Sequence, residues 1–383
     1  MKVVISDTKN WLEAVSVYRQ PRVVGMVFLG FSAGLPFLLV FSTLSAWLRD
    51  AGIERTTIGF FSWIGITYSI KFFWAPVIDR LPLFYLTRLM GKRRSWMLFA
   101  QICIASGLLG MATGDPHTEL QLIAVFALVV AFGSATQDIT IDAYRIEAID
   151  KRLQGAMAAT YVFGYRIALL VAGAGAFYIA DFRSWPFAYF VMAALMGIGV
   201  VTTLIIREPD HRHDDNTSAL EASLEKSVGI EDRQSSFAML AAWFVDAVVT
   251  PFIEFFRRTG WLALFILLLI GCYRLSDITM GVMANPFYLD LGFSKTDIAS
   301  VSKVFGFFMT ITGAGLGGLF VVRYGIMRPL LAGAILVAFT NLFFVWLALS
   351  KPDLVSLAVV VSADNLSGGF ATSAFVAVNF LTY

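Results

Sequence analysis

Two acidic residues, Asp138 and Asp142, interrupt an otherwise apolar run of the sequence, SATQDITIDAYR. They fall one helical turn apart and Arg145 follows three residues later, so a helix would place all three on one face. Two carboxylates at this spacing repel each other as anions in a low-dielectric setting, which favours the protonated form of one of them. Such a group can carry a proton. The structural alternative is that Lys71 or Arg166 pairs with either acid and only holds helices together.

Charged residues also interrupt other long apolar runs. Arg274 and Asp277 can neutralise each other within one helix, or Arg274 can hold a carboxylate of a ligand. Lys71 and Lys303 have no acid beside them in the sequence, which favours a place in a hydrated cavity. With the polar and aromatic residues next to these charges, the predicted substrate-contacting set is Tyr68, Lys71, Gln137, Tyr165, Arg166, Arg274, Asp277, Lys303, Asp364 and Asn365.

The elements that must position these residues are too apolar for a water-soluble protein. Of the 383 residues, 58% are hydrophobic and 15% are charged, and the mean hydropathy is +0.75. A water-soluble chain carries roughly 25% charged residues. The net charge of +2 gives no reason to expect nucleic-acid binding. The composition therefore predicts a protein surrounded by membrane lipid.

Ten apolar windows are long enough to cross a bilayer, which needs roughly 20 residues of helix. The alternation typical of membrane strands is missing, so we predict an all-α helical bundle. The windows cover approximately residues 23–48, 56–78, 95–113, 120–143, 154–180, 184–206, 261–289, 298–322, 329–350 and 354–378.

The basic residues between the windows predict the orientation. Lys and Arg are frequent before the first window and in the even-numbered connections, whereas the odd-numbered connections carry few and the third, GDPHTE, carries none. Cytosolic loops hold the excess of positive charge. The amino terminus is therefore expected in the cytosol.

A long connection separates the sixth and seventh windows. It begins as a polar run, REPDHRHDDNTSALEASLEKS, and becomes amphipathic in FAMLAAWFVDAVVTPFIEFFRR. This order predicts a flexible linker followed by a helix at the membrane surface, with re-entry into the membrane as the alternative. We expect a six-helix half over residues 1–206, a cytosolic linker over 207–260, and a four-helix part over 261–383.

The charges inside the windows follow a period of three, because the third, sixth and ninth windows contain none; the first window, which also contains none, is the one exception. If every third helix faces lipid and the others face a hydrated interior, this distribution is explained. A repeated three-helix unit with a long central connection is typical of secondary transporters.

An acid and a basic run lie between the second and third windows, with DR at 79–80 and GKRR at 91–94. This loop, and a weaker copy six windows later, resembles the GxxxDRxGRR signature of the major facilitator superfamily, although neither copy matches it fully. An acid at a helix end beside a basic cluster predicts a cytosolic latch between helices. Its expected members are Asp79, Arg80, Arg93, Arg94 and Arg323.

Several longer stretches resemble the AmpG-type muropeptide permeases. They are GFSAGLPFLLVFSTLSAWL from residue 30, TIGFFSWIGITYSIKFFWAPVIDR from 57, SATQDITIDAYR from 134, GYRIALLVAG from 164, YRLSDITMGVM from 273 and DNLSGGFATSAFVA from 364. The resemblance implies a major facilitator fold in the bacterial inner membrane and proton-driven import of anhydro-muropeptides, the disaccharide-peptides of cell-wall turnover. It also implies a monomer as the working unit.

The family pattern continues past the last of these stretches with at least two more helices, whereas this chain stops at Tyr383. Ten of twelve expected helices are then present. We expect either that further helices exist in the intact gene product or that a partner chain covers this flank.

Other functions remain open. A related carrier could move another large polar solute such as acetyl-coenzyme A, and a degenerate paralogue could move nothing. An intramembrane enzyme is disfavoured, because the sequence offers no nucleophile-base pair, and no cofactor or metal is expected. A phosphate-binding loop is also missing, which argues against ATP coupling within these residues.

Overall fold

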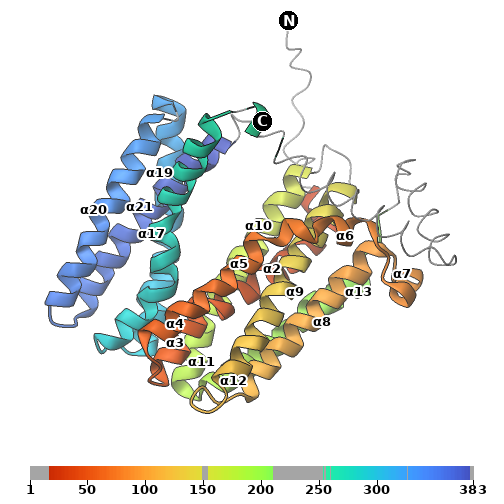
Figure 1. The fold of residues 1–383 in the computed structure, drawn as a ribbon, viewed down its shortest axis with the longest axis horizontal. Coiled ribbons are helices and arrows are strands. Elements are labelled where there is room, and N and C mark those ends of the chain that lie inside the picture. Colours follow the sequence, from red (N-terminus) through yellow and green to blue (C-terminus); the bar gives the residue numbers. More distant parts are fainter. Residues whose placement is uncertain are drawn as a thin grey trace, which may run out of the picture.

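The described part of the chain is helical, as the sequence predicts. The computed structural model describes residues 17–148, 154–209, 253, 256–258, 260–325 and 327–379, and none of these forms a strand. Figure 1 shows two groups of long helices, an N-terminal bundle coloured red to green and a C-terminal bundle coloured teal to blue. Most of the linker predicted over 207–260 lies outside the described residues.

The N-terminal bundle runs from a short 3₁₀ turn to α13. Its elements are η1 (Val17–Arg19), α2 (Pro21–Val40), α3 (Ser42–Asp50), α4 (Arg55–Phe61), η2 (Ser62–Ile64), α5 (Gly65–Ser69), η3 (Lys71–Phe73), α6 (Ala75–Arg80), α7 (Phe84–Met90), α8 (Lys92–Thr113), α9 (Leu120–Glu147), α10 (Gln154–Leu170), η5 (Val171–Gly175), α11 (Ala176–Phe182), α12 (Trp185–Leu195) and α13 (Gly197–Ile205).

The C-terminal bundle contains fewer and longer helices. Its elements are α17 (Leu262–Asp290), α18 (Lys295–Asp297), η7 (Ile298–Phe305), α19 (Gly306–Tyr324), α20 (Met327–Leu349) and α21 (Leu354–Asn379). Among the described elements, η5 and η7 have π-helical geometry, which often occurs at functional positions of helices.

Eight stretches of helix in the described residues are long and apolar enough to cross a membrane. They correspond to eight of the ten predicted windows. The seventh window is present as α17, a helix of 29 residues in which many side chains are not described. The second window, 56–78, differs clearly from the prediction of one continuous helix.

The second window folds as a succession of short helices, α4, η2, α5, η3 and α6, which follow one another along the bundle in Figure 1. Gly59 and Gly65 lower its helix propensity, and Pro76 at the start of α6 has no backbone N–H to continue the hydrogen-bond ladder. The consequence is local: Lys71 sits in the 3₁₀ turn η3 instead of on a regular helix face.

The outer faces of the C-terminal bundle are apolar. On α20, Leu331, Ile335, Phe339 and Leu349 are all more than half exposed, with Leu349 at 84%. Such a surface is unfavourable in water and favourable against lipid chains. Water-soluble proteins place polar side chains on such outer faces, so the apolar outer face agrees with a bundle embedded in a membrane.

Glycines set the distance between the most closely packed helices. A Cβ added at Gly164 on α10 would collide with the carbonyl oxygen of Val27 on α2, and one at Gly30 would collide with that of Tyr161. Close approach of helix backbones through small residues is a main source of packing energy in membranes, where burial of apolar side chains adds little.

We therefore expect Gly164→Ala to destabilise the protein by about 1–3 kcal/mol or more, because backbone atoms of α2 must move to admit the methyl group. Thermal unfolding of the detergent-solubilised protein, followed by size-exclusion chromatography, measures the effect. Gly155→Ala, on the same helix but with open space around the added Cβ, is the matched control. It should leave the midpoint unchanged or raise it slightly, since alanine favours helix. Equal losses in both variants would contradict the packing argument.

Candidate functional site

The acid Asp138 on α9 faces Lys71 across the bundle. The Lys71 Nζ atom lies 3.7 Å from Asp138 Oδ2, a distance longer than that of a good hydrogen bond. The side chains are 38% and 22% exposed, so the pair is reachable from outside the packed core. The other oxygen, Asp138 Oδ1, is buried and accepts no hydrogen bond from any described residue. This acid therefore has a loose partner and an open acceptor.

Asp142 lies one turn further along α9 and has a different partner. Its Oδ1 atom is 3.2 Å from Arg145 Nη2, an ion pair formed within the helix. The predicted face with Asp138, Asp142 and Arg145 is present, since one continuous helix carries all three. The two acids nevertheless differ, because Asp142 is 54% exposed and compensated by its own helix.

The position of Lys71 depends on the broken second segment. Three residues later, Trp74 Nε1 donates a hydrogen bond to Thr136 Oγ1 at 3.2 Å, and its ring lies 5.2 Å from that of Phe132. Both partners are on α9. These contacts fix the 3₁₀ turn η3 against α9 and bring Lys71 level with Asp138.

Three tyrosines surround the acid. The hydroxyl of Tyr68 lies beside Ser134 and Asp138, and its ring contacts Phe37 at 5.9 Å and Phe41 at 5.7 Å. Tyr161 and Tyr165 on α10 have ring centroids 6.1 Å apart, and both approach Asp138. The structure thus brings together four of the predicted residues, Tyr68, Lys71, Asp138 and Tyr165.

Two predicted members of this set lie elsewhere. Gln137 is fully buried, and its side-chain amide donates to Ser32 Oγ at 3.0 Å. It holds α9 against α2, and its side chain points about 100° away from that of Asp138 around the helix axis. Arg166 is exposed and forms no ion pair with a described residue, so of the two cations in the structural alternative it is Lys71, and not Arg166, that lies beside Asp138.

Lys303 lies in η7, between the two bundles. Its ammonium nitrogen is 5.6 Å from the centroid of the Phe177 ring, and its aliphatic stem lies within 3.4–3.6 Å of where a Cβ of Gly173 would be. No described acid pairs with it. A cation held over an aromatic ring, with no partner among the described carboxylates, can accept an anionic group of a ligand.

The remaining predicted cavity residues belong to the C-terminal bundle. Asn365 on α21 accepts a hydrogen bond from Thr310 Oγ1 at 2.8 Å and donates to its own helix at Val361 O. Its neighbour Asp364 lies near the Tyr288 hydroxyl. The side chains of Arg274 and Asp277, both on α17, lie outside the described residues.

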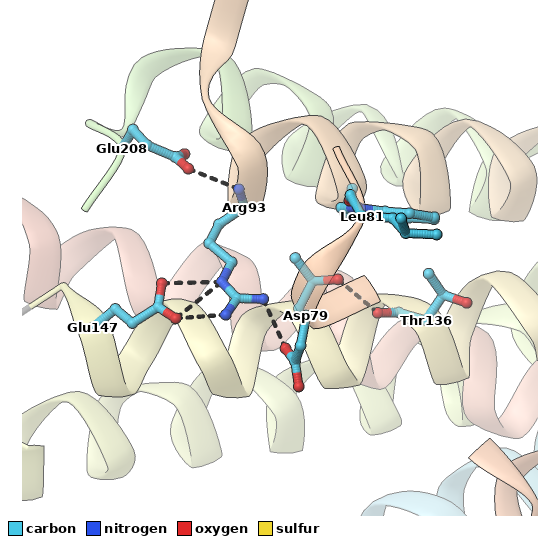
Figure 2. A network of polar contacts seen from close by, with 8 residues as sticks. Asp79, Leu81, Arg93, Thr136, Glu147 and Glu208 are labelled. Atoms are coloured by element: carbon cyan, nitrogen blue, oxygen red, sulfur yellow. Dashed lines mark hydrogen bonds and ion pairs between the residues drawn. The ribbon is translucent and has the colours of Figure 1, made fainter. Parts of the chain in front are cut away.

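A second polar cluster lies at the start of α8, at the opposite end from the α3–α4 turn. Figure 2 shows the Arg93 guanidinium between Asp79, at 2.8 Å, and Glu147, at 2.5 Å. Only 9% of the Arg93 side chain is exposed. One cation therefore joins α6, α8 and α9, in agreement with the geometry expected for Asp79 and Arg93 in the latch.

Two acids outside the predicted latch complete this cluster. Glu147 is the last residue of α9, and Glu208 follows α13; the Glu208 carboxylate accepts the backbone N–H groups of Arg93 at 2.7 Å and Arg94 at 3.1 Å. It caps the positive end of α8. Gly91, at φ +86°, is needed here, because a Cβ would collide with Glu208. In the sequence, the only indication that these two residues belong to the cluster is that they are acids at the ends of the fourth and sixth windows.

Three other predicted latch residues behave differently. Arg94 donates to the carbonyl oxygens of Thr203 at 2.9 Å and Leu204 at 2.6 Å, so it satisfies the end of α13 instead of pairing with an acid. Arg323 is exposed, and its guanidinium lies over the ring of Tyr324 at 5.6 Å. The side chain of Arg80 lies outside the described residues.

The arrangement of these residues is suited to binding a polar ligand and transferring a proton. Within the described residues no group of three or more His, Cys, Asp or Glu side chains could hold a metal ion. What the site offers is an acid with an open acceptor, two cations and several aromatic rings, distributed over helices of both bundles. Such groups can hold a polar ligand and exchange a proton with it or with water.

The chain is similar to known membrane transporters in sequence and in fold. The sequence profile described as Major Facilitator Superfamily matches residues 23–383. An anhydromuropeptide permease of Escherichia coli K12 is 36% identical over 365 residues, which covers 94% of this chain and 68% of that protein. A putative transporter AmpG 4 of Rickettsia conorii is 29% identical over 95% of this chain and 83% of its own length.

Solved structures agree on the fold. The crystal structure of a D-xylose-proton symporter superposes with a TM-score of 0.58 at 12% identity, covering 94% of this chain and 82% of that one. The nucleoside transporter NupG gives 0.58 at 13% identity, covering 93% and 82%. At these identities the likeness concerns the arrangement of helices alone.

Proposed function

Because the chain belongs to the major facilitator superfamily and, within it, to the family of the AmpG-type muropeptide permeases, we propose that it imports anhydro-muropeptides across the bacterial inner membrane. The observation that carries this proposal is the 36% identity to the anhydromuropeptide permease over 94% of the chain. In this proposal the protein is a monomeric carrier that makes and breaks no covalent bond, so the disaccharide-peptide reaches the cytosol unchanged.

The proposed arrangement in the membrane follows the positive charges of the connections. The amino terminus and the linker over 207–260 lie in the cytosol, between a six-helix half over 1–206 and the part over 261–383. The latch around Arg93 is then on the cytosolic side, and the turns at Asp50, Asp181 and Asp290 face the periplasm.

We propose that Asp138 carries the coupling proton. Its open oxygen and its loose contact with Lys71 support this role, because a carboxylate that is not tightly paired can take up a proton. Asp142 is the second candidate, although one of its oxygens is already held in an ion pair with Arg145. Proton movement into the cytosol would supply the driving force.

The substrate has two chemically different ends, and the site has matching groups. Tyr68 and Tyr165 offer ring faces and hydroxyls that suit sugar rings. Lys303 offers a cation without a described acid partner, which suits a peptide carboxylate. Lys71 and the α21 pair of Asp364 and Asn365 are the remaining proposed contacts within the described side chains; Arg274 and Asp277 are proposed from the sequence.

Uptake of radiolabelled anhydro-muropeptide into proteoliposomes tests the function. With an inward-directed pH gradient we expect accumulation above equilibrium, and we expect it to stop when a protonophore removes the gradient. Unlabelled anhydro-muropeptide should compete, whereas acetyl-coenzyme A should not. Absence of uptake by well-folded protein under all gradients would contradict the proposal, and competition by acetyl-coenzyme A alone would reassign the substrate.

A further inference from the structure

Three aromatic rings meet beside the acid Asp138. The centroid of the Phe37 ring on α2 lies 5.2 Å from that of Phe41 and 5.9 Å from that of Tyr68, and the Phe41 and Tyr68 centroids are 5.7 Å apart. All three distances lie in the range in which aromatic rings attract each other. We call Phe37, Phe41 and Tyr68 the aromatic triad.

Two members of the triad are fixed by the packing of the bundle. Phe41 and Tyr68 both pack against the main cluster of buried apolar side chains. The Phe41 ring rests on Gly65 of α5, where an added Cβ would lie 3.3 Å from a ring carbon. The Tyr68 hydroxyl lies beside Asp138. These two rings therefore form a firm support for the third.

Phe37 is the accessible member of the triad, with 38% of the residue exposed. Its side of α2 is given by Gly34, one helical turn earlier, where an added Cβ would collide with the carbonyl oxygen of Tyr165. Phe37 thus lies on the side of α2 that faces Tyr165, which itself approaches Asp138. The exposed ring belongs to the surroundings of the acid.

A cation lies on the other side of the triad. Leu38, the residue after Phe37, has its Cδ1 atom 3.2 Å from the place of an added Cβ at Gly173, and the Cδ atom of Lys303 lies 3.4 Å from the same place. The Leu38 and Lys303 side chains therefore meet over one glycine. The exposed Phe37 ring lies between a carboxylate and an ammonium group.

This combination suits a ligand with an apolar face and polar edges. A pyranose ring presents C–H groups on its face and hydroxyl groups around its rim. The face of an aromatic ring is electrically negative and attracts C–H groups, and covering both surfaces removes apolar area from water. A lipid chain would match the Phe37 ring but would leave the charges of Asp138 and Lys303 without a polar partner.

From this geometry we infer that a sugar ring of the ligand stacks on Phe37, and that Phe41 and Tyr68 are positioning residues that hold the Phe37 ring in place. The inference rests on the proposed function, because an anhydro-muropeptide supplies the sugar rings. It goes further in assigning the sugar and the peptide to different places. The sugar lies on the triad, and the acidic part of the ligand extends toward Lys303.

Binding of two ligands to the purified protein tests the inference. One ligand is an anhydro-muropeptide with its peptide, and the other is the same disaccharide without the peptide; isothermal titration calorimetry gives the Kd of each. Phe37→Leu keeps an apolar side chain but removes the flat face, so we expect both Kd values to rise by about fivefold, and by the same factor. Phe37→Tyr keeps the ring and should bind both ligands within about twofold of the wild type. In proteoliposomes Phe37→Leu should raise KM and leave the maximal rate unchanged.

Phe339→Leu is the matched control, because it removes an exposed ring from the apolar outer face of α20. It should change neither Kd. Unchanged binding in Phe37→Leu would overturn the inference, as would a loss confined to the ligand with the peptide, since Phe37 would then contact the peptide. If the wild type bound neither ligand, the proposed function itself would fail.

A measurement on the wild type keeps the inference testable if Phe37→Leu does not fold. In saturation-transfer difference NMR with irradiation of the aromatic protons of the protein, ligand protons close to aromatic rings receive the most saturation. We expect the C–H protons of one sugar ring to give stronger signals than the protons of the peptide. The reverse order would place the peptide on the triad and contradict the inference.

Discussion

Asp138→Asn is expected to abolish pH-driven accumulation of substrate, with uptake falling by about tenfold or more, while the protein still inserts and folds. The asparagine side chain keeps the size and a carbonyl acceptor but cannot take up a proton, so the coupling step is lost and binding is retained. Uptake into proteoliposomes with and without a pH gradient measures this. Exchange of labelled for unlabelled substrate, which needs no net proton movement, should persist.

The control for this experiment is Asp115→Asn, an acid that contacts only its own loop. It should transport as the wild type does. Unchanged accumulation in Asp138→Asn would remove Asp138 from the mechanism. Loss of folded protein would instead mean that the contact with Lys71 mainly holds η3 to α9, and Asp142→Asn would then become the decisive variant for coupling.

Arg93→Ala should destabilise the protein by about 1.5–3 kcal/mol, because Asp79 and Glu147 lose a charged hydrogen-bond partner. The arginine is almost buried and neutralises Asp79 and Glu147 together, so its removal leaves two acids close to each other without a cation. Arg93→Lys should recover only part of the loss, because an ammonium group lacks the planar fork that reaches both carboxylates. Thermal unfolding in detergent measures each variant.

The neighbouring Arg88 provides the control. It is exposed on α7, and Arg88→Ala should change stability by less than about 0.5 kcal/mol. A triple variant, Asp79→Asn, Glu147→Gln and Arg93→Met, should regain most of the stability, because it removes the two acids together with the cation that pairs with them. If Arg93→Ala were as stable as Arg88→Ala, the cluster would be a peripheral contact and its role as a latch would be excluded.

The sequence by itself determined the class of fold. In lipid, backbone polar groups must be satisfied within the segment, so long apolar runs can only be helices, and their lengths and the charges inside them are readable from the residues alone. The same argument identified Asp138 as an acid in the membrane. The acid at a helix end and the basic cluster after it predicted the latch that contains Asp79 and Arg93.

The partners of these residues required the tertiary structure. A helical period gives the spacing of residues on a face, but it does not give the rotation of that face relative to the neighbouring helices. Gln137 and Asp138 are adjacent in the sequence, yet one is buried against Ser32 and the other faces Lys71. The rotation of α9 decided this, together with the breaks in the second segment that placed Lys71 in η3.

The packing of glycines likewise depends partly on the sequence and partly on the tertiary structure. Small residues such as Gly313, Gly315, Gly317 and Gly318 on α19 favour close helix packing. Only Gly313 and Gly317 face the backbone of α21, whereas added Cβ atoms at Gly315 and Gly318 would meet open space. Likewise, Glu147 and Glu208 are ordinary helix-end acids until the fold brings the ends of α6, α8, α9 and α13 together around Arg93. The local sequence pattern determines which side chains each helix presents on a face. The crossing of the helices, which depends on backbone contacts far apart in the chain, determines which of these side chains come into contact.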